Sequence, residues 1–463
     1  GGTITIQDRD VGAPDLDLAI TTDSINTSMS GAGDAGSINL VARTVTVSGD
    51  GRLVSSSIGT NAEAGGQAGK AGNVTVTANT LTLSNGGQIA ATTVDGDGAD
   101  TDGDGQRDGG SINLAVDTLT VQSGAKVTAA TTGAGNAGDI TVWGIGSPPA
   151  RRADTVTISG GELTSSTTGA GNAGSVNVYT EKLSIEATES FPRGGLFSES
   201  GTGASTAASS RSQPAAVGQD GDAGSITVDA GQVTIINGGQ ISVAALGNGN
   251  AGSVTIQGLG DGGPDAGSAS LLLASGGQID AQALQGQAGN VLILTADEGV
   301  GSVVLDQGQI LAISNDPDGQ GSILIAGPGS TIEDINTSTP GPRYVILQNQ
   351  SLISANSGNP KAGDAILNAR GIVIDGTSAV RASGDVFTIG SVLGSPLELP
   401  AAETVDASDD LTTRCTPAEI GGRSTFVVRG NRPADIRSPY LPVDGSTGAL
   451  WGKQSLACAG QLP

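Results

Sequence analysis

Histidine is absent from this chain of 463 residues, cysteine occurs only twice, and aromatic residues make up only 2% of the sequence. Without histidine, the chain cannot build a Ser–His or Cys–His nucleophile or a histidine metal site. Because Phe, Tyr and Trp normally fill the centre of a globular core, their scarcity argues against a thick core. We therefore expect Val, Ile, Leu and Ala to fill a thin and regular one.

Basic residues are also scarce: 21 Lys and Arg stand against 46 Asp and Glu, which gives a net charge of −25. This balance argues against nucleic acid as a partner, because no basic stripe is available to contact phosphates. Such an acidic surface keeps molecules apart and attracts divalent cations. Long hydrophobic runs are missing too. None approaches the roughly 20 residues that a membrane-spanning helix needs, so no transmembrane segment is expected.

Glycine, by contrast, is abundant and occurs in a repeated phrase. GAGNAG stands at residues 133–138 and 169–174, with the variants GAGDAG at 31–36 and GNGNAG at 247–252. Each phrase ends on a glycine that precedes an alternating polar and apolar run, such as SINL or SVNV. Alignment on this glycine indicates a repeat architecture. The anchor glycines are Gly2, Gly36, Gly72, Gly110, Gly138, Gly174, Gly224, Gly252, Gly289, Gly321 and Gly363.

The repeat unit predicts an all-β fold, a right-handed parallel β-helix with about three short strands per coil. Residues 110–138 hold three runs of period 2, SINL, TLTV and KVTA, separated by small turns. Each strand would pair with its equivalent one coil later, about 4.8 Å along the axis. We expect about 11 coils over residues 1–393. The insertions near 95–109, 144–153 and 186–222 then fall at turns, where a solenoid tolerates them.

The glycine-rich phrases are interpreted as corners of the coils. Glycine adopts positive φ and has no Cβ to clash, while Asn or Asp tolerates the left-handed region and can bond its own backbone. A second corner has the form GGQI, as at residues 86–89 and 238–241. The alternative, a phosphate-binding loop, needs a following helix, and the sequence shows no helical periodicity. Inward positions, such as Ile38 and Leu40, would be apolar, and outward ones would be Thr, Asn and Ser.

Two insertions carry residues that could have a function. The insertion at 186–222 is rich in Ser, Ala and Gly and is interpreted as a surface loop. A grafted binding loop around Phe191 and Phe197 is the alternative. Arg151 and Arg152 lie in another insertion beside two prolines, and we expect a solvated loop there rather than a catalytic base.

The two ends of the sequence differ from the repeats. Residues 394–463 are rich in proline and carry both cysteines, and we expect a C-terminal cap and an extended tail. In an exported protein, Cys415 and Cys458 favour a disulfide over a metal site. The repeat already begins at Gly2, and a bare first coil would expose strand edges. A longer chain is therefore expected to precede this sequence.

One local motif points to a metal. Asp100, Asp102, Asp104 and Asp108, together with Gly105, match D-x-D-x-D-G-x-x-D. Alternate carboxylates on a tight loop can converge on one hard cation, and Ca²⁺ prefers such oxygen ligands. The motif therefore predicts a calcium site, with a solvated acidic turn as the alternative. No other cofactor is expected.

The coil phrase GxAG-S-[IV]-[NT]-[VIL], the GGQI corner and a tail of the form C…GRSTFVVRGNRP…P occur together in this chain. In this combination the chain resembles the large filamentous-haemagglutinin-like exoproteins of cyanobacteria, which are described as two-partner-secretion or S-layer-family proteins. The coil resemblance covers Gly2–Leu393, and the more specific tail resemblance covers Cys415–Pro442.

The resemblance implies export across the inner membrane and then through a dedicated outer-membrane β-barrel transporter. It also implies a right-handed β-helix that is displayed at the cell surface or released. The family's N-terminal secretion domain, which the transporter recognises, is missing from this sequence. That difference agrees with the expectation of a longer chain.

Two classes of function follow as hypotheses. The first is a non-catalytic adhesin or structural spacer, with polysaccharides or proteins of the cell surface as partners. The second is a β-helical polysaccharide lyase or hydrolase, which would need paired carboxylates or a basic proton acceptor in a groove. The outward Thr, Ser and Asn residues favour the first. A surface-binding array of flat Thr ladders is a third idea, which the variation between Thr, Asn and Ser weakens.

Overall fold

The computed structural model describes residues 2–7, 16–31, 33–59, 69–94, 108–133, 135–146, 151–201, 221–260, 270–296, 301–316, 319–334, 341–357 and 363–393. The chain divides into two compact units. The first comprises residues 1–264 with 269–395, and the second comprises residues 265–268 with 396–463. The second unit, with Cys415 and Cys458, lies outside the described residues. Within the described ranges, no helix is long and apolar enough to cross a membrane.

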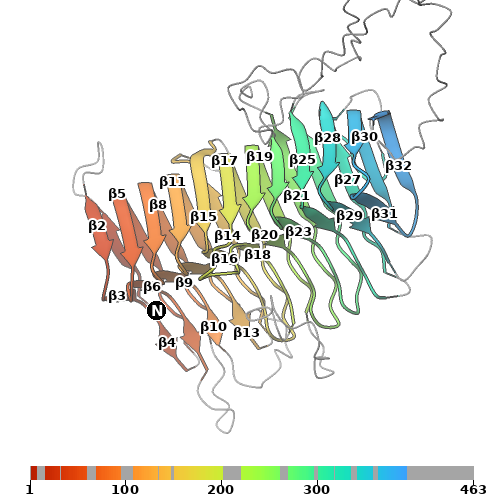
Figure 1. The fold of residues 1–463 in the computed structure, drawn as a ribbon. Helices are drawn as coiled ribbons and strands as arrows, with labels where there is room; N and C mark the ends of the chain where they lie inside the picture. Colours follow the sequence, from red (N-terminus) through yellow and green to blue (C-terminus); the bar gives the residue numbers. More distant parts are fainter. Residues whose placement is uncertain are drawn as a thin grey trace, which may run out of the picture. The chain divides into compact units, whose positions relative to one another are not determined.

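The first unit is built from strands that pair in parallel and form three sheets (Figure 1). Sheet A has 17 strands, sheet B has 11 and sheet C has 4. Sheet A contains β1 (Ile4–Gln7), β2 (Asp17–Ile20), β5 (Ile38–Ser48), β8 (Val74–Ser84), β11 (Ile112–Gln122), β14 (Ile140–Trp143), β15 (Ala153–Ser159), β17 (Val176–Glu186), β19 (Ile226–Ile236), β21 (Val254–Leu259), β22 (Leu271–Ala274), β24 (Val291–Thr295), β25 (Ser302–Asp306), β27 (Ile323–Ala326), β28 (Tyr344–Gln348), β30 (Ala365–Ile374) and β32 (Val386–Leu393).

The other two sheets are made of shorter strands. Sheet B contains β3 (Ser24–Asn26), β6 (Arg52–Val54), β9 (Gln88–Ala90), β12 (Lys126–Thr128), β16 (Glu162–Thr164), β18 (Gly195–Phe197), β20 (Gln240–Ser242), β23 (Gln278–Asp280), β26 (Gln309–Leu311), β29 (Leu352–Ala355) and β31 (Ala379–Ala382). Sheet C contains β4 (Met29–Ser30), β7 (Ser57–Ile58), β10 (Thr93–Val94) and β13 (Thr131–Thr132).

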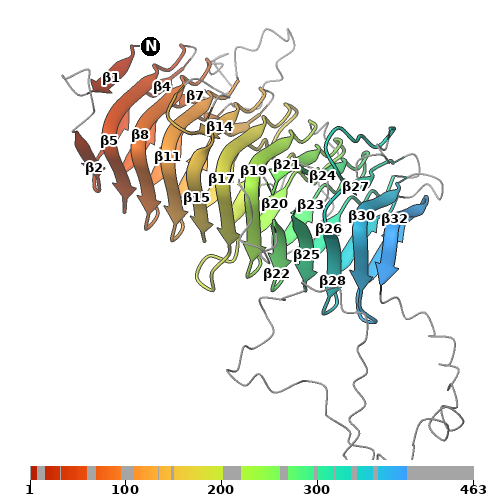
Figure 2. The same ribbon diagram turned by 90° about the horizontal axis from the view of Figure 1, so that it is seen from above.

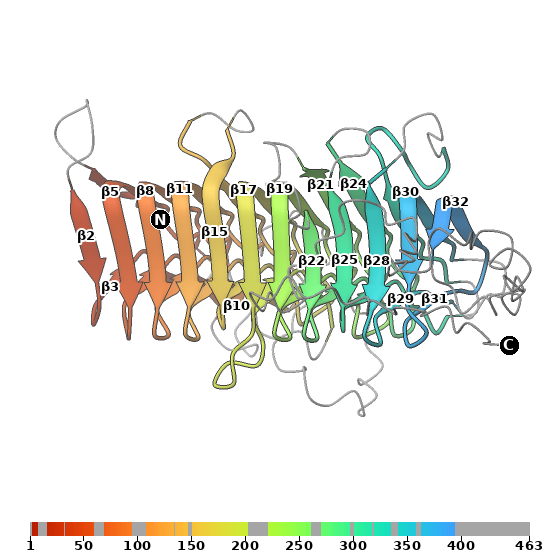
Figure 3. The same cartoon turned by 45° about the horizontal axis from the view of Figure 1, so that its top comes forward.

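The alignment on anchor glycines is confirmed by the register of sheet A. The residue two positions after each anchor pairs with the residue two positions after the next anchor, from one repeat to the following one. Figure 3 shows the long strands of successive repeats side by side. These residues are Ile4, Ile38, Val74, Ile112, Ile140, Val176, Ile226, Val254, Val291, Ile323 and Ala365. From Ile38 onward they have no exposed surface and belong to one continuous apolar core.

The predicted fold class, a right-handed β-helix with about three short strands per coil, is wrong as stated and needs correction. The structure is all-strand, but the first two predicted runs of a repeat form one strand, as in Ile38–Ser48 and Val74–Ser84. Both runs therefore belong to the same 17-stranded sheet, and the third sheet has only four strands. Figure 2 shows the long strands of sheet A as continuous curved arrows.

The long strands β5 and β8 bend in the middle without ending, and no turn residue marks the bend in their sequences. In β5, Ala42 and Val45 point into the core, while Arg43 and Thr44 between them both face outward. The neighbouring strand β8 has the same pattern around Asn79 and pairs with β5 on both sides of the bend. The two strands thus keep the same register on both sides of the bend, and no Gly or Pro marks it in β5 or β8.

The glycine corners prove to be of two kinds. At the GGQI corner the backbone is left-handed, with φ of 50° at Asn85 and 84° at Gly86. The anchor glycines instead permit close packing: a Cβ on Gly252 would lie 1.8 Å from the carbonyl oxygen of Gly224, one repeat earlier. No positive φ is found at either of these anchors.

The Asn or Asp of the GAGNAG phrase bonds the following repeat, and the prediction that it bonds its own backbone is wrong. The N–H of Asn172 donates to Oδ1 of Asn136 over 2.9 Å. The N–H of Asp222 donates to Oδ1 of Asn172 over 2.8 Å, and that of Asn250 donates to Oδ1 of Asp222 over 2.7 Å. We call this series the Asx ladder. It satisfies one backbone donor per repeat.

Candidate functional site

The predicted calcium ligands fall mostly outside the described residues, as Asp100, Asp102 and Asp104 do. Asp108 is described and belongs to the Asx ladder, because its Oδ1 accepts the N–H of Asn136 over 2.9 Å. Its carbonyl oxygen accepts the hydroxyl of Thr93 over 2.8 Å. Among the described residues, no three acidic or cysteine side chains are grouped for a metal. The calcium site stays a prediction.

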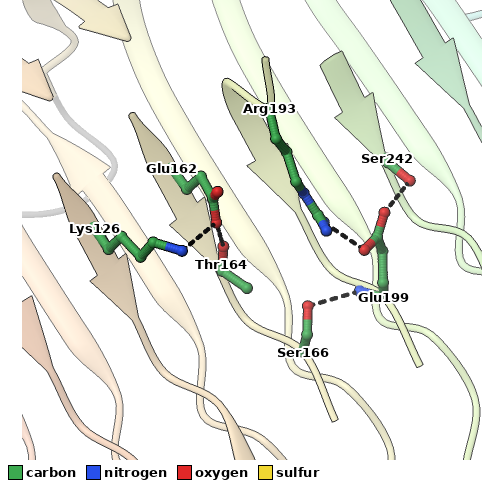
Figure 4. A network of polar contacts seen from close by, with 7 residues as sticks. All are labelled: Lys126, Glu162, Thr164, Ser166, Arg193, Glu199 and Ser242. Atoms are coloured by element: carbon green, nitrogen blue, oxygen red, sulfur yellow. Dashed lines mark hydrogen bonds and ion pairs between the residues drawn. The ribbon is translucent and has the colours of Figure 1, made fainter. Parts of the chain in front are cut away.

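A network of charged side chains lies on the outward face of sheet B, over strands β12, β16, β18 and β20 (Figure 4). The middle residue of each of these short strands, such as Leu163 or Leu196, is buried in the core. Because strand residues alternate between the two faces, the residues on either side of it face outward. We call this group the Arg193 cluster. Its members are Lys126, Glu162, Thr164, Ser166, Arg193, Glu199 and Ser242.

A tight turn that follows β17 positions Arg193 in the cluster. Thr188 and Phe191 exchange two backbone hydrogen bonds of 3.0 Å. The Phe191 ring then packs where Gly124 has no side chain, since a Cβ there would lie 2.4 Å from the ring. Beyond this turn, the guanidinium of Arg193 lies 3.8 Å from the ring centroid of Phe197, a cation–π geometry. The insertion is therefore held against the sheet by both phenylalanines.

Glu199 is the buried acid of the cluster, with only 6% of its surface exposed. Its Oε2 accepts Arg193 over 2.5 Å, and its Oε1 accepts the Ser242 hydroxyl over 2.7 Å. Its own N–H donates to Ser166 Oγ over 3.2 Å. Burial raises the pKa of Glu199, because desolvation outweighs the attraction of Arg193 and the bond from Ser242, and the charge of Glu162 adds to the rise.

Glu162 and Lys126 form the outer edge of the cluster. Lys126 Nζ lies 3.4 Å from Glu162 Oε2, and the Thr164 hydroxyl approaches the same oxygen at 3.5 Å. The lysine is almost half exposed, so this pair contributes little stability.

The cluster contains two carboxyl groups, Glu162 and Glu199, on neighbouring repeats. A general acid and base in a hydrolase would need such a pair of carboxyl groups. Glu199, however, uses both oxygens for Arg193 and Ser242 and is almost completely covered. A substrate could not reach it without breaking these bonds. The arrangement is that of a structural clamp that closes the insertion onto sheet B.

Part of the insertion at 186–222 is thus an ordered part of the sheet and not a surface loop. Residues 195–197 form β18, which pairs with β16 and β20, and Phe197 has no exposed surface. Residues 202–220 lie outside the described residues. The signal that could have revealed β18 is the run FPRGGLF, the most apolar part of the insertion.

A second polar cluster lies on the outward face of sheet A. Arg152 is only 17% exposed and its Nε donates to Asp229 Oδ1 over 2.8 Å, so the prediction of a solvated loop is wrong for this residue. Arg151 is half exposed and lies 3.0 Å from Asp117. Sequence reasoning missed the Arg152–Asp229 pair because 77 residues separate the partners.

Comparison of the chain with protein-family models, with curated proteins and with solved structures finds no match.

Proposed function

We propose that this chain is part of an exported, non-catalytic surface protein that acts as a structural spacer and as an adhesive display surface. The observation that carries the proposal is a regular array of threonines on the outward face of sheet A. Thr44, Thr80, Thr118 and Thr155 are register partners on four adjacent strands. Thr46, Thr82, Thr120 and Thr157 form a second such column two residues on.

This array favours contact over an area rather than chemistry at one point. Successive strands repeat every 4.8 Å or so, and the hydroxyls on one face repeat at that spacing. All of these threonines are half-buried, so each presents a hydroxyl from a rigid backbone. Over these four strands the face offers the same group to each part of a ligand that lies across them.

The buried charges support a structural role as well. The Glu199–Ser242 bond of the Arg193 cluster and the Arg152–Asp229 pair both join inserted segments to strands of a different repeat. The resemblance to filamentous-haemagglutinin-like exoproteins supports export through an outer-membrane transporter and a place at the cell surface. Under this proposal, a polysaccharide or protein of a neighbouring surface is the partner.

Two measurements test the proposal. Microspheres coated with the protein should be retained on a cell layer under flow more strongly than albumin-coated microspheres. Incubation of the protein with acidic polysaccharides should release no reducing ends. Equal retention of the two kinds of microsphere would contradict the adhesive role, and release of reducing ends that Glu199→Gln abolishes would favour the hydrolase or lyase instead.

A further inference from the structure

Two of the chain's few aromatic residues lie next to each other on the outward face of sheet A. Trp143 follows Val142 in β14, and Tyr179 follows Val178 in β17, and these two valines are register partners. Trp143 is 8% exposed, and its indole N–H donates to the Gly146 carbonyl over 3.2 Å. Tyr179 is half-buried. In a chain with 2% aromatic residues, this pair is a local concentration.

Polar groups continue the same row beyond Tyr179. Asp229 is the register partner of Tyr179 on β19, and Gln257 is the partner of Asp229 on β21. The Gln257 side-chain amide donates to Asp229 Oδ2 over 3.0 Å, while Arg152 binds the other oxygen of Asp229. Arg152 also lies 3.7 Å from Glu181. A carboxylate, an amide and a guanidinium are thus held in the row that continues from the tyrosine.

A β-bulge in β21 makes room for the Arg152 guanidinium. The pairing of β21 with β24 shifts by one residue between Ile256 and Leu259, which is a β-bulge. Gly258 in this bulge has a φ of 78°, and a Cβ there would lie 2.3 Å from an Arg152 nitrogen. Any other residue at Gly258 would push the guanidinium away from Asp229. Bulges of this kind re-aim side chains and are frequent beside functional sites.

We propose that Tyr179, Asp229, Gln257 and Arg152 form a binding site for a neutral saccharide chain, while the covered Trp143 lies outside the contact surface. An aromatic face packs against the C–H face of a sugar ring, and a few convergent polar groups orient its hydroxyls. The net charge of −25 repels polyanions, which selects a neutral polymer. The inference rests on the proposed adhesive function, because it names the ligand class for that surface.

A neighbouring row extends the site along the sheet. Thr141, Asn177, Thr227 and Thr255 are register partners on the same four strands, two residues before the aromatic row. Their hydroxyl and amide groups repeat about every 4.8 Å. A linear saccharide lying across the strands would therefore meet polar groups at each repeat, with Tyr179 as its packing surface.

Affinity electrophoresis in native gels tests the site. The gels contain dextran, mixed-linkage β-glucan or galactomannan as neutral probes, and alginate as the acidic one. The protein should be retarded by at least one neutral polymer, and Tyr179→Ala should weaken that affinity about tenfold or more, as truncation of a central contact residue does. The matched control is Tyr344→Ala, which removes another half-buried tyrosine of sheet A, on β28.

Three outcomes would overturn the inference: no retardation by any neutral polymer, an equal loss in the Tyr344→Ala protein, or stronger retardation by alginate. Because Tyr179→Ala could disturb packing, Asn177→Ala is measured as well, and it should weaken binding with an unchanged melting temperature. The microsphere assay separates the two proposals. Retention that survives Tyr179→Ala would sink only the saccharide site, whereas absent retention of the unaltered protein would sink the adhesive function.

Discussion

The close packing of the anchor glycines leads to a sharp prediction for Gly252→Ala. An ideal Cβ at this position would lie 1.8 Å from the carbonyl oxygen of Gly224. A carbon and a carbonyl oxygen approach no closer than about 3.3 Å, so the two repeats must separate locally by about 1.5 Å. The obstacle is backbone and cannot rotate away, unlike the tip of a flexible side chain.

Two hydrogen bonds flank the point of contact. The Ala223 N–H donates to the Asn250 carbonyl over 2.9 Å, and the Ile226 N–H donates to the Ser253 carbonyl over 3.0 Å. A separation of about 1.5 Å breaks both, at about 0.5–1.5 kcal/mol each. Overpacking adds about 1–3 kcal/mol. The local free energy of opening should thus fall by about 2–6 kcal/mol.

Hydrogen exchange followed by mass spectrometry is the suitable assay, because a repeat array can open locally. Peptides that cover residues 222–256 should exchange much faster in Gly252→Ala, and the melting temperature should fall. Gly376→Ala is the control, since a Cβ at Gly376 meets nothing within 4 Å and the residue needs no positive φ. Equal exchange and melting in the two variants would refute the close-packing account.

Three further predictions concern polar groups. Burial raises the pKa of the Glu199 carboxyl, so this group binds its proton more tightly in the folded protein than in the unfolded chain. The protection of β18 against hydrogen exchange should therefore decline as pH rises above 4.5. In Glu199→Gln, this protection should depend less on pH. Burial opposes the ionisation of Asp375, but hydrogen bonds from Asn349 and from the turn after Asp375 outweigh it and lower its pKa from 3.8 to about 2. The stability that it contributes above pH 3.8 should therefore be lost as pH falls toward 2, and thermal melts of Asp375→Asn should lack this acid sensitivity. Asn172→Ala removes the acceptor of the Asp222 amide and should cost about 0.5–1.5 kcal/mol in denaturant melts, whereas Asn172→Asp should cost less.

The sequence by itself determined the repeat and the residues that face the core. Strict alternation after each anchor glycine predicts which residues face the core, and Ile112 and Leu114 are indeed completely buried. The spacing of the anchors also predicted which residues pair between repeats, as Ile112 with Ile140 shows. Both follow from short-range physics: side chains of a strand alternate with period 2, and only glycine fits where backbones nearly touch.

Only the tertiary structure decided how the strands are shared among the sheets and where the charged side chains meet. The bend at Arg43 and Thr44 carries no turn residue, because β5 pairs with the next repeat in the same register on both sides of it. Arg152 meets Asp229 across 77 residues, and their contact depends on the lengths of the insertions between them. Which residues become partners depends on the lengths of all the strands and insertions between them. A local sequence pattern does not contain this information.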